Sequence, residues 1–284
     1  MEYDNFLTNQ LVDQVINLAF KEDIDQGDIT SESVVSESAQ AKAEWTAKDD
    51  GILAGLSVAK KVFSRLDENL EWNPKFSDGD SISKGDILVK FNGSCRSLLT
   101  GERIALNFVQ RMSGIATKTN HIVKKLESQN TKILDTRKTA PGLRVLDKYA
   151  VAAGGGTNHR MGLFDMAMIK DNHIIAAGSI QKAVDKVRQN NPGVKIEVET
   201  TTLSQVEEAL EAGADIIMLD NMDIEMMKNA VERIGKQAQT EASGNITEKN
   251  ITDVAGTGVN FISIGALTHS VKAFDISQSV QEIR

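Results

Sequence analysis

The pattern of apolar and polar positions divides the chain into two parts with different rhythms. Apolar residues recur at helical spacing in residues 8–22 and in residues 100–127, which predicts an amphipathic helix in each stretch. Gly114 lies inside the second pattern and predicts a break in that helix. Between the two, residues 40–95 show short strand-like runs separated by turn sequences, with a helical pattern at 57–66. The first part is therefore predicted to be an α+β module.

From about residue 130 onward, short apolar runs alternate with helical patterns, and each apolar run ends in polar residues. Repeated strand–helix units of this kind predict a parallel sheet. No Gly-x-Gly-x-x-Gly sequence opens a helix, which argues against a dinucleotide-binding sheet. The number of units suits an α/β barrel, either complete or reduced. The expected strands are 133–134, 166–169, 194–198, 216–219, 241–242 and 261–264, with helices at 180–189, 203–212 and 224–234.

The polar residues that end these strands are the candidate site. In α/β barrels the active face lies at the carboxyl ends of the strands, so these side chains are expected to converge. The early strands end in cations and the middle strands in carboxylates, while the last two end in small residues suited to binding phosphate through backbone N–H groups. The residues concerned are Arg137, Lys170, Glu199, Asp220, the run Ser243, Gly244 and Asn245, and the run Ser263, Ile264 and Gly265.

Charge supports an anionic ligand. The whole chain of 284 residues carries a formal charge of −8, whereas residues 132–173 contain seven Lys and Arg against four Asp. The fork geometry of Arg137 and Arg160 suits carboxylates. Glu199 and Asp220 suit sugar hydroxyls or a hydrated Mg²⁺ ion. The sequence thus predicts a ligand with a dianionic part, a hydroxyl-rich part and a phosphate.

Composition narrows the class of protein. Net negative charge disfavours a nucleic-acid surface, and no run of about 18 apolar residues suggests a membrane span. The N-terminus does not have the pattern of a secretory signal. Cys95 is the single cysteine, which we interpret as a packing thiol in a reducing, cytoplasmic compartment. His159 and His173 lack the spacing of a zinc site. The acidic stretch 22–30 is interpreted as a turn that caps the next segment rather than a calcium loop.

Several long motifs, in order, resemble the quinolinate phosphoribosyltransferase family, also called the carboxylating nicotinate-nucleotide pyrophosphorylases. The resemblance covers nearly the whole chain. The matching stretches are GDIT at 27–30, ERIALN at 102–107, SGIAT at 113–117, DTRKTAPGLR at 135–144, GGGTNHR at 154–160, IKDNH at 169–173, MLDNM at 218–222 and GALTHS at 265–270.

The resemblance implies a fold and an assembly. Residues 1–112, joined by the C-terminal tail 271–284, would form an α/β sandwich domain. Residues 113–270 would form a seven-stranded, incomplete TIM-like α/β barrel that carries the catalytic site. It also implies a homodimer or higher homo-oligomer in which the sandwich of one subunit covers the barrel mouth of another, so that Arg103 reaches the partner's site.

The resemblance further implies a reaction: quinolinate and phosphoribosyl pyrophosphate give nicotinate mononucleotide, pyrophosphate and CO₂ with Mg²⁺, in NAD biosynthesis. The carboxylates of quinolinate would be held by Arg103, Arg137, His159, Arg160 and Lys170. The catalytic residues, which also face phosphoribosyl pyrophosphate, would be Lys138, Lys170, Glu199 and Asp220, with the last two holding the metal through water. The 5′-phosphate would lie against Ser243, Gly244, Asn245, Ser263, Ile264 and Gly265.

Three other hypotheses remain open at this stage. A related phosphoribosyltransferase acting on another anionic aromatic acid would share most of these features. A Schiff-base aldolase would use Lys170 as its nucleophile. A non-catalytic sensor would bind a phosphorylated sugar without turnover.

Overall fold

The computed structural model describes residues 10–126 and 129–283, and these fall into two compact units. One unit contains the chain up to Asn120, then Thr139–Gly155 and the stretch from Leu267 onward; the other contains His121–Lys138 and Gly156–Ala266. We refer to them as the N-terminal unit and the C-terminal unit.

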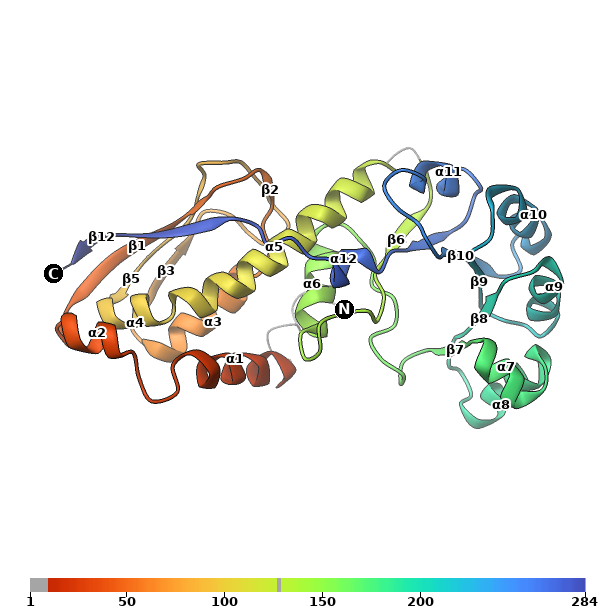
Figure 1. The fold of residues 1–284 in the computed structure, drawn as a ribbon, viewed down its shortest axis with the longest axis horizontal. Helices are drawn as coiled ribbons and strands as arrows, with labels where there is room; N and C mark the ends of the chain where they lie inside the picture. Colours follow the sequence, from red (N-terminus) through yellow and green to blue (C-terminus); the bar gives the residue numbers. More distant parts are fainter. Residues whose placement is uncertain (1–9, 127–128, 284) are drawn as a thin grey trace. The chain divides into compact units, whose positions relative to one another are not determined.

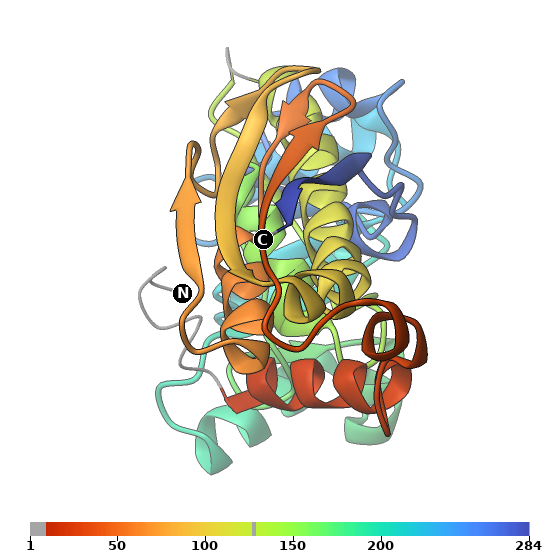
Figure 2. The ribbon, with the colours of Figure 1, turned by 90° about the vertical axis from the view of Figure 1, so that its left-hand side faces the viewer.

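An antiparallel sheet of four strands, in the order β12-β1-β5-β3, forms the N-terminal unit together with its helices (Figures 1 and 2). The last strand of the chain, β12, pairs with β1, so the C-terminal tail completes this sheet. The strands are β1 (Gln40–Ala47), β3 (Glu71–Pro74), β5 (Ile87–Ser94) and β12 (Ile276–Ile283), with β2 (Gly51–Ile52) and β4 (Ser81–Ile82) as a separate pair. The helices are α1 (Gln10–Asp23), α2 (Ile29–Val34), α3 (Leu56–Leu66), α4 (Cys95–Thr100), α5 (Glu102–Lys124), α6 (Arg144–Ala153) and α12 (Ala266–His269).

Aromatic side chains fill the core of this unit. Trp45, Phe63, Trp72 and Phe91 lie with neighbouring ring centroids 5.1–6.0 Å apart, in edge-on and tilted arrangements that aromatic quadrupoles favour. Cys95 is a buried free thiol, which confirms its role in packing.

Six parallel strands form the sheet of the C-terminal unit, in the order β6-β11-β10-β9-β8-β7. Thr157 forms a single parallel bridge to Leu134 on the outer side of β6, and this residue is the nearest equivalent of the expected seventh strand. The α/β fold class and all six predicted strands are thus confirmed. They are β6 (Lys132–Leu134), β7 (Ala167–Ile169), β8 (Ile196–Thr200), β9 (Ile216–Asp220), β10 (Gln239–Ser243) and β11 (Phe261–Ser263).

Helices cover one face of this parallel sheet (Figure 1). The three predicted helices are present as α8 (Ile180–Asn190), α9 (Leu203–Glu211) and α10 (Ile224–Ile234), and each packs against the strands beside it. Two shorter helices that the periodicity did not predict are α7 (Asp171–Ala177) and α11 (Ile251–Ala255). Their shortness explains the omission, because one or two turns do not establish a 3.6-residue period.

The predicted break at Gly114 is wrong, because α5 is continuous from Glu102 to Lys124. A Cβ atom on Gly114 would lie 2.0 Å from the backbone oxygen of Lys272. The glycine is therefore required by the close passage of the C-terminal segment, not by a change in the helix.

Helix α6 carries two of the cations counted in residues 132–173. They are Arg144 and Lys148, and Lys148 is fully buried. In the same unit, Arg111 makes a two-pronged contact with the buried Asp147, at 2.8 Å from each carboxylate oxygen. Arg111 is thus a structural ion-pair partner.

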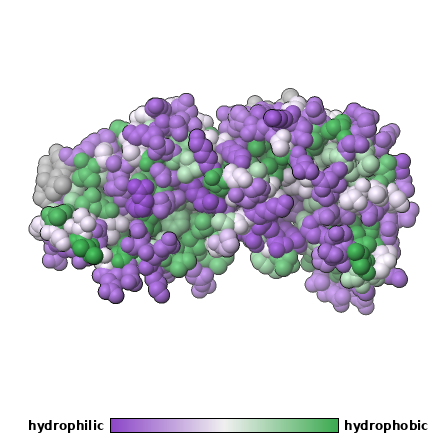
Figure 3. Space-filling view, in the orientation of Figure 1, coloured by the Kyte–Doolittle hydropathy of each residue, from purple (hydrophilic) through white to green (hydrophobic). Residues whose placement is uncertain are grey.

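Hydrophilic residues cover most of the face shown in Figure 3, with apolar patches between them. Among the described residues, no helix combines the length and the apolar character needed to span a bilayer.

Asp28 confirms the interpretation of the acidic stretch as a cap. Its side chain accepts the backbone N–H groups of Thr30 and Ser31 at the start of α2, at 3.1 and 3.0 Å. It also accepts the hydroxyls of Ser31 and Thr100, at 2.6 and 3.0 Å. The Ser31 hydroxyl and these N–H groups lower the pKa of Asp28 below its usual value, because they bond best to the ionised form.

We expect Asp28→Ala to lower the free energy of unfolding by about 1–2 kcal/mol, the usual cost of losing an N-cap. Because the folded-state pKa is depressed, the stabilisation is present above the unfolded value of 3.8 and is lost as pH falls through the folded-state value. Chemical denaturation at pH 7 and at pH 3 measures both effects. Glu37→Ala, at an exposed acid outside any helix, is the matched control. Equal losses of unfolding free energy for Asp28→Ala and Glu37→Ala at pH 7 would contradict the assignment of Asp28 as the N-cap of α2.

Candidate active site

The cations of the early strands lie at the carboxyl end of β6. Asp135 follows the strand and is fully buried, whereas Arg137 and Lys138 two and three residues later are exposed. The Lys138 N–H donates to the Thr136 hydroxyl at 3.1 Å, which turns the chain here. The turn therefore presents two neighbouring cations at the edge of the sheet where the strands end.

Arg160 brings a further cation to the same region. It is half-buried, and its guanidinium donates to the backbone oxygen of Met166 at 2.9 Å, just before β7. Burial lowers the pKa of Arg160, and the charge of Arg137 lowers it further, so the two guanidinium groups are close enough to repel one another. An exposed and a half-buried cation that repel one another form a site that a bound dianion would stabilise.

The middle strands supply carboxylates. Lys170, directly after β7, forms an ion pair with Glu199 near the end of β8. Asp220 ends β9 and is half-buried, and it accepts the Asn221 side-chain amide at 2.9 Å. The structure thus places Lys170, Glu199 and Asp220 at the carboxyl ends of three adjacent strands, as the sequence predicted.

The ends of β9 and β10 turn sharply beside Asp220. Asn221, Gly244 and Asn245 have positive φ angles of 54°, 95° and 51°. Ser243 lies opposite Asp220 in the sheet, its carbonyl accepts the Asn221 N–H at 2.9 Å, and the Asn245 amide donates to the Asn221 side chain at 3.1 Å. This left-handed turn presents backbone in a conformation suited to anion binding.

The end of β11 differs from this turn. The N–H group of Ile264 donates to the Leu134 carbonyl at 3.0 Å, so it is used within the sheet and does not face a ligand. Ser263 is buried at 8% exposure and Gly265 is half-buried. Of the predicted phosphate-binding run, Ile264 is therefore corrected to a structural residue.

His159 lies in an environment that the sequence did not predict. Its ring is 7% exposed, and Nε2 lies 3.1 Å from Glu197 and 3.2 Å from Glu241, both fully buried. On the other side, Nδ1 accepts the backbone N–H of Arg160 at 2.7 Å. Both ring nitrogens therefore face protein groups, and direct binding of a carboxylate by His159, as expected above, does not fit this geometry.

The groups of the His159–Glu197–Glu241 cluster shift one another's pKa values. Burial lowers the pKa of His159, but the two carboxylates raise it by more. Burial and the facing Glu241 raise the pKa of Glu197 to about 7, although His159 acts in the opposite direction. Because Nδ1 accepts the Arg160 N–H, the ring presents Nε2 to the two carboxyl groups, and a proton on Nε2 lies between them.

Arg103 lies in the N-terminal unit, exposed on α5. Arg137, Arg160, Lys170, Glu199 and Asp220 all belong to the C-terminal unit, and Arg103 is the predicted site residue that belongs to the other unit.

The carboxylates at the strand ends fit a magnesium ion. Glu199 and Asp220 offer hard oxygen donors, and Glu199 retains 17% exposure of its side chain, which leaves room for coordinated water. The buried cluster of His159, Glu197 and Glu241 also brings three ligand atoms within 4.8 Å of one another. Its nitrogen donor and lack of exposure suit Mg²⁺ poorly.

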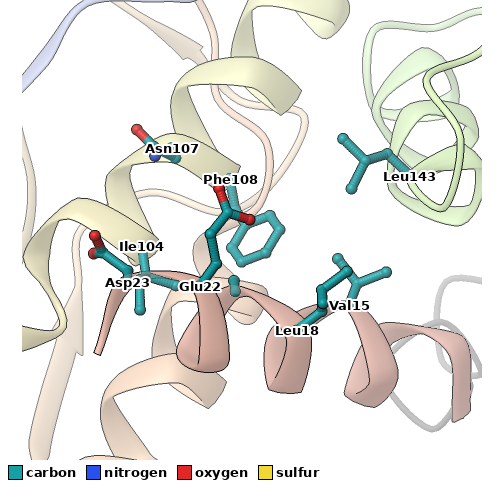
Figure 4. A pocket seen from close by; sticks show the side chains of 9 residues that line it. Val15, Leu18, Glu22, Asp23, Ile104, Asn107, Phe108 and Leu143 are labelled. Atoms are coloured by element: carbon teal, nitrogen blue, oxygen red, sulfur yellow. The ribbon is translucent and has the colours of Figure 1, made fainter. Parts of the chain in front are cut away.

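A cavity of about 230 Å³ lies elsewhere, in the N-terminal unit between α1 and α5 (Figure 4). Its walls include the apolar Val15, Leu18 and Phe108, while Glu22 and Asp23 lie at its edge. No lysine or arginine lines it, so it does not suit a dicarboxylate.

Comparison with known proteins decides the family. A model of the quinolinate phosphoribosyl transferase N-terminal domain matches residues 28–113, and one of the C-terminal domain matches residues 115–279. The chain belongs to the quinolinate phosphoribosyltransferase family.

Relatives of this family match over almost the full length. The probable carboxylating nicotinate-nucleotide pyrophosphorylase of Bacillus subtilis is 49% identical, covering 94% of this chain and 92% of the relative. The decarboxylating quinolinate phosphoribosyltransferase 1b of Nicotiana tabacum is 45% identical, covering 94% of this chain and 81% of the relative. The crystal structure of NadC from Streptococcus pyogenes superposes with a TM-score of 0.91 at 42% identity, covering 96% of each chain.

The two quinolinate phosphoribosyltransferase models adjoin inside helix α5, which runs without interruption through residues 113–115. The boundary predicted after residue 112 therefore stays a prediction. Helix α6 lies within the C-terminal match, yet its contacts place it in the N-terminal unit.

Sequence reasoning missed the buried acids Asp135, Glu197 and Glu241. The sequence gives little indication that these acids are buried. A charged residue in a short apolar strand is normally interpreted as facing solvent in an alternating pattern. The sequence Glu197–Val198–Glu199 did contain a clue. Alternate residues of a strand share one face, so Glu197 is expected on the same face of the sheet as Glu199, which was already a candidate site residue.

We expect Gly244→Ala to lower the free energy of unfolding by about 2–4 kcal/mol. The change adds left-handed strain, and its Cβ would lie 2.2 Å from the Asn221 side-chain oxygen, displacing the turn beside Asp220. Gly213→Ala is the matched control, with a φ of 76° but nothing within 4 Å of the added Cβ. Thermal denaturation of both variants gives the comparison, and equal losses would show that Gly244 matters only for its backbone angle.

Proposed function

We propose that this protein transfers the phosphoribosyl group of phosphoribosyl pyrophosphate to quinolinate, with loss of CO₂. The products are nicotinate mononucleotide and pyrophosphate, as in NAD biosynthesis. Membership of the quinolinate phosphoribosyltransferase family supports this proposal. The structural observations that support it are the closeness of the Arg137 and Arg160 guanidinium groups and the Lys170–Glu199 ion pair, all within the C-terminal unit.

In this proposal the cations bind the two carboxylates of quinolinate. Arg137 and Arg160 offer planar donors that match a carboxylate in two-pronged fashion. Their mutual repulsion in the free protein favours the bound dianion. The pyridine nitrogen is then directed at the anomeric carbon of the phosphoribosyl donor. Holding the two reactants in line can supply up to roughly 7–11 kcal/mol in favourable cases.

The carboxylates act on the sugar. As pyrophosphate leaves, positive charge develops on the ribose ring, and Glu199 and Asp220 stabilise that charge while accepting hydrogen bonds from the hydroxyls. Lys138 and Lys170 neutralise the departing pyrophosphate. Ser243, Gly244 and Asn245 receive the 5′-phosphate.

We propose that Mg²⁺ is held by Glu199 and Asp220 through water; when bound, it neutralises charge on the leaving pyrophosphate. Joining the ring nitrogen to the sugar makes the pyridinium an electron sink. The carbon–carboxylate bond at position 2 then breaks and CO₂ leaves, while the electron pair stays on that carbon, stabilised by the adjacent positive nitrogen, until a proton is added there. Decarboxylation therefore follows ring attachment.

We also propose a homodimer or higher homo-oligomer with shared sites, in which Arg103 of one subunit completes the quinolinate site of another. The support is that Arg103 is exposed on α5, in the unit that does not carry the strand-end cluster. The free, buried Cys95 supports a reducing, cytoplasmic compartment.

The aldolase hypothesis is disfavoured by the environment of Lys170. A Schiff-base lysine needs an amine that is free to attack a carbonyl, whereas the Lys170 amine is engaged in an ion pair with Glu199. The sensor and the phosphoribosyltransferase with a different aromatic acid are separated from our proposal by the assay below.

The deciding assay supplies quinolinate labelled at the 2-carboxylate, together with phosphoribosyl pyrophosphate and Mg²⁺. We expect labelled CO₂ and nicotinate mononucleotide in equal amounts, and no turnover when a chelator removes the metal. Nicotinate, which lacks the 2-carboxylate, is the comparison substrate. Binding without turnover would favour a sensor, and faster turnover of another aromatic acid would favour the related enzyme.

We expect Arg137→Ala to lower kcat/KM for quinolinate by roughly 10² or more, equivalent to about 2–4 kcal/mol for a lost ion contact. Lys132→Ala is the control, because this exposed cation lies at the amino end of β6, whereas Arg137 follows its carboxyl end. Steady-state kinetics of both variants provide the measurement. Similar kinetics for wild type and Arg137→Ala would remove Arg137 from the site.

Shared sites predict complementation between inactive chains. Arg103→Ala and Arg137→Ala homodimers should each be nearly inactive, whereas a mixture that exchanges subunits should regain activity, since some sites in the hybrids carry neither change. Native mass spectrometry establishes that hybrids have formed. Confirmed hybrids without recovered activity would show that each subunit works alone.

A further inference from the structure

Two buried glutamates lie below the proposed substrate residues without a role in the mechanism above. Glu197 precedes Glu199 by two residues on β8, and Glu241 precedes Ser243 by two residues on β10. Because alternate residues of a strand share a face, each buried acid lies on the same side of the sheet as a site residue. Both are fully buried, and both face the ring of His159.

The segment that carries Arg160 is held from several strands. Asp135, after β6, accepts the His159 backbone N–H at 2.9 Å and the Asn158 side-chain amide at 2.7 Å. Glu197 and Glu241 hold the far side of the His159 ring, at 3.1 and 3.2 Å. The near side of the ring accepts the Arg160 N–H at 2.7 Å. The backbone of Arg160 is thus linked, through one imidazole, to acids on β8 and β10.

This arrangement is costly for a purely structural core. Within the described part of the chain, no hydrogen bond of good geometry reaches any of the four carboxylate oxygens of Glu197 and Glu241. One ring N–H cannot point well at two carboxylates, so among the described residues at least one carboxyl group lacks a well-aligned donor. Apolar side chains would fill the same space at a lower desolvation cost. Such a cluster is more readily explained by the need to fix one side chain in one place.

We propose that Glu197 and Glu241 are positioning residues that fix the His159 ring and, through it, the Arg160 backbone, so that the Arg160 guanidinium meets a carboxylate of quinolinate. The inference rests on the proposed function, because it names quinolinate as the substrate whose binding depends on the cluster. Asp135 supports the same segment from β6. None of the three acids touches the substrate.

If these residues position Arg160, their substitution should impair the binding of quinolinate more than the binding of phosphoribosyl pyrophosphate. In Glu241→Gln and Glu197→Gln, the amide keeps the size of the side chain but replaces the carboxyl group that faces Nε2 of the ring. We expect KM for quinolinate to rise about tenfold or more, while KM for phosphoribosyl pyrophosphate and kcat change less than about threefold. His159→Gln should show the same split. In the double variant that combines His159→Gln with Glu241→Gln, the two increases in KM for quinolinate should not add, because both substitutions disturb the same contact between the ring and Arg160.

Glu44→Gln is the matched control, a glutamate of 14% side-chain exposure on β1 in the N-terminal unit. It should leave both KM values unchanged. Wild-type enzyme is assayed first: if it does not convert quinolinate, the proposed function fails before the cluster is tested. Far-UV circular dichroism and thermal denaturation establish whether each variant is folded.

Three outcomes would overturn the inference when wild type is active. Equal rises in both KM values would indicate general loosening of the unit. Failure of all three single variants to fold would assign the cluster to stability alone. Elemental analysis that finds about one tightly bound metal ion per wild-type chain, lost in Glu241→Gln, would make the cluster a metal site.

Discussion

The period of two along a β-strand is the constraint on which the rest of this structure depends. It places Glu197 and Glu199 on one face of β8, and Glu241 and Ser243 on one face of β10. A parallel sheet then brings the carboxyl ends of these strands to one edge. Residues far apart in the sequence thereby form a site with polar groups at the edge and ionisable groups below it.

Charge is divided within that site. Arg137 and Lys138 follow β6, and Arg160 precedes β7, whereas Glu199 and Asp220 lie at the carboxyl ends of β8 and β9. A bisubstrate transfer between a dianionic ring and a sugar that becomes positive needs both kinds of charge. Strand order separates Arg137 and Lys138 from the two carboxylates, while Lys170, after β7, pairs directly with Glu199.

Much of this was predictable from the sequence, and the reasons for success and failure are physical. Strands β8 and β9 were found because runs such as Ile216–Leu219 are apolar and end in an acid. The continuity of α5 was not predicted, because a glycine within a helical pattern is usually interpreted as a break. Only the structure shows that the Lys272 backbone passes beside Gly114 and requires a residue without a side chain. The strand-end residues followed from the geometry of parallel sheets. The partners of His159 did not follow, because Glu197 and Glu241 come close only in the folded sheet, where β8 and β10 lie on either side of β9. No periodicity of the sequence encodes that order of strands.

The most direct test of this account is the crystal structure of the protein with quinolinate bound. The account predicts the two carboxylates of quinolinate against Arg137 and Arg160, with the ring nitrogen turned toward Glu199 and Asp220. Quinolinate bound away from these residues, for instance in the cavity between α1 and α5, would contradict it.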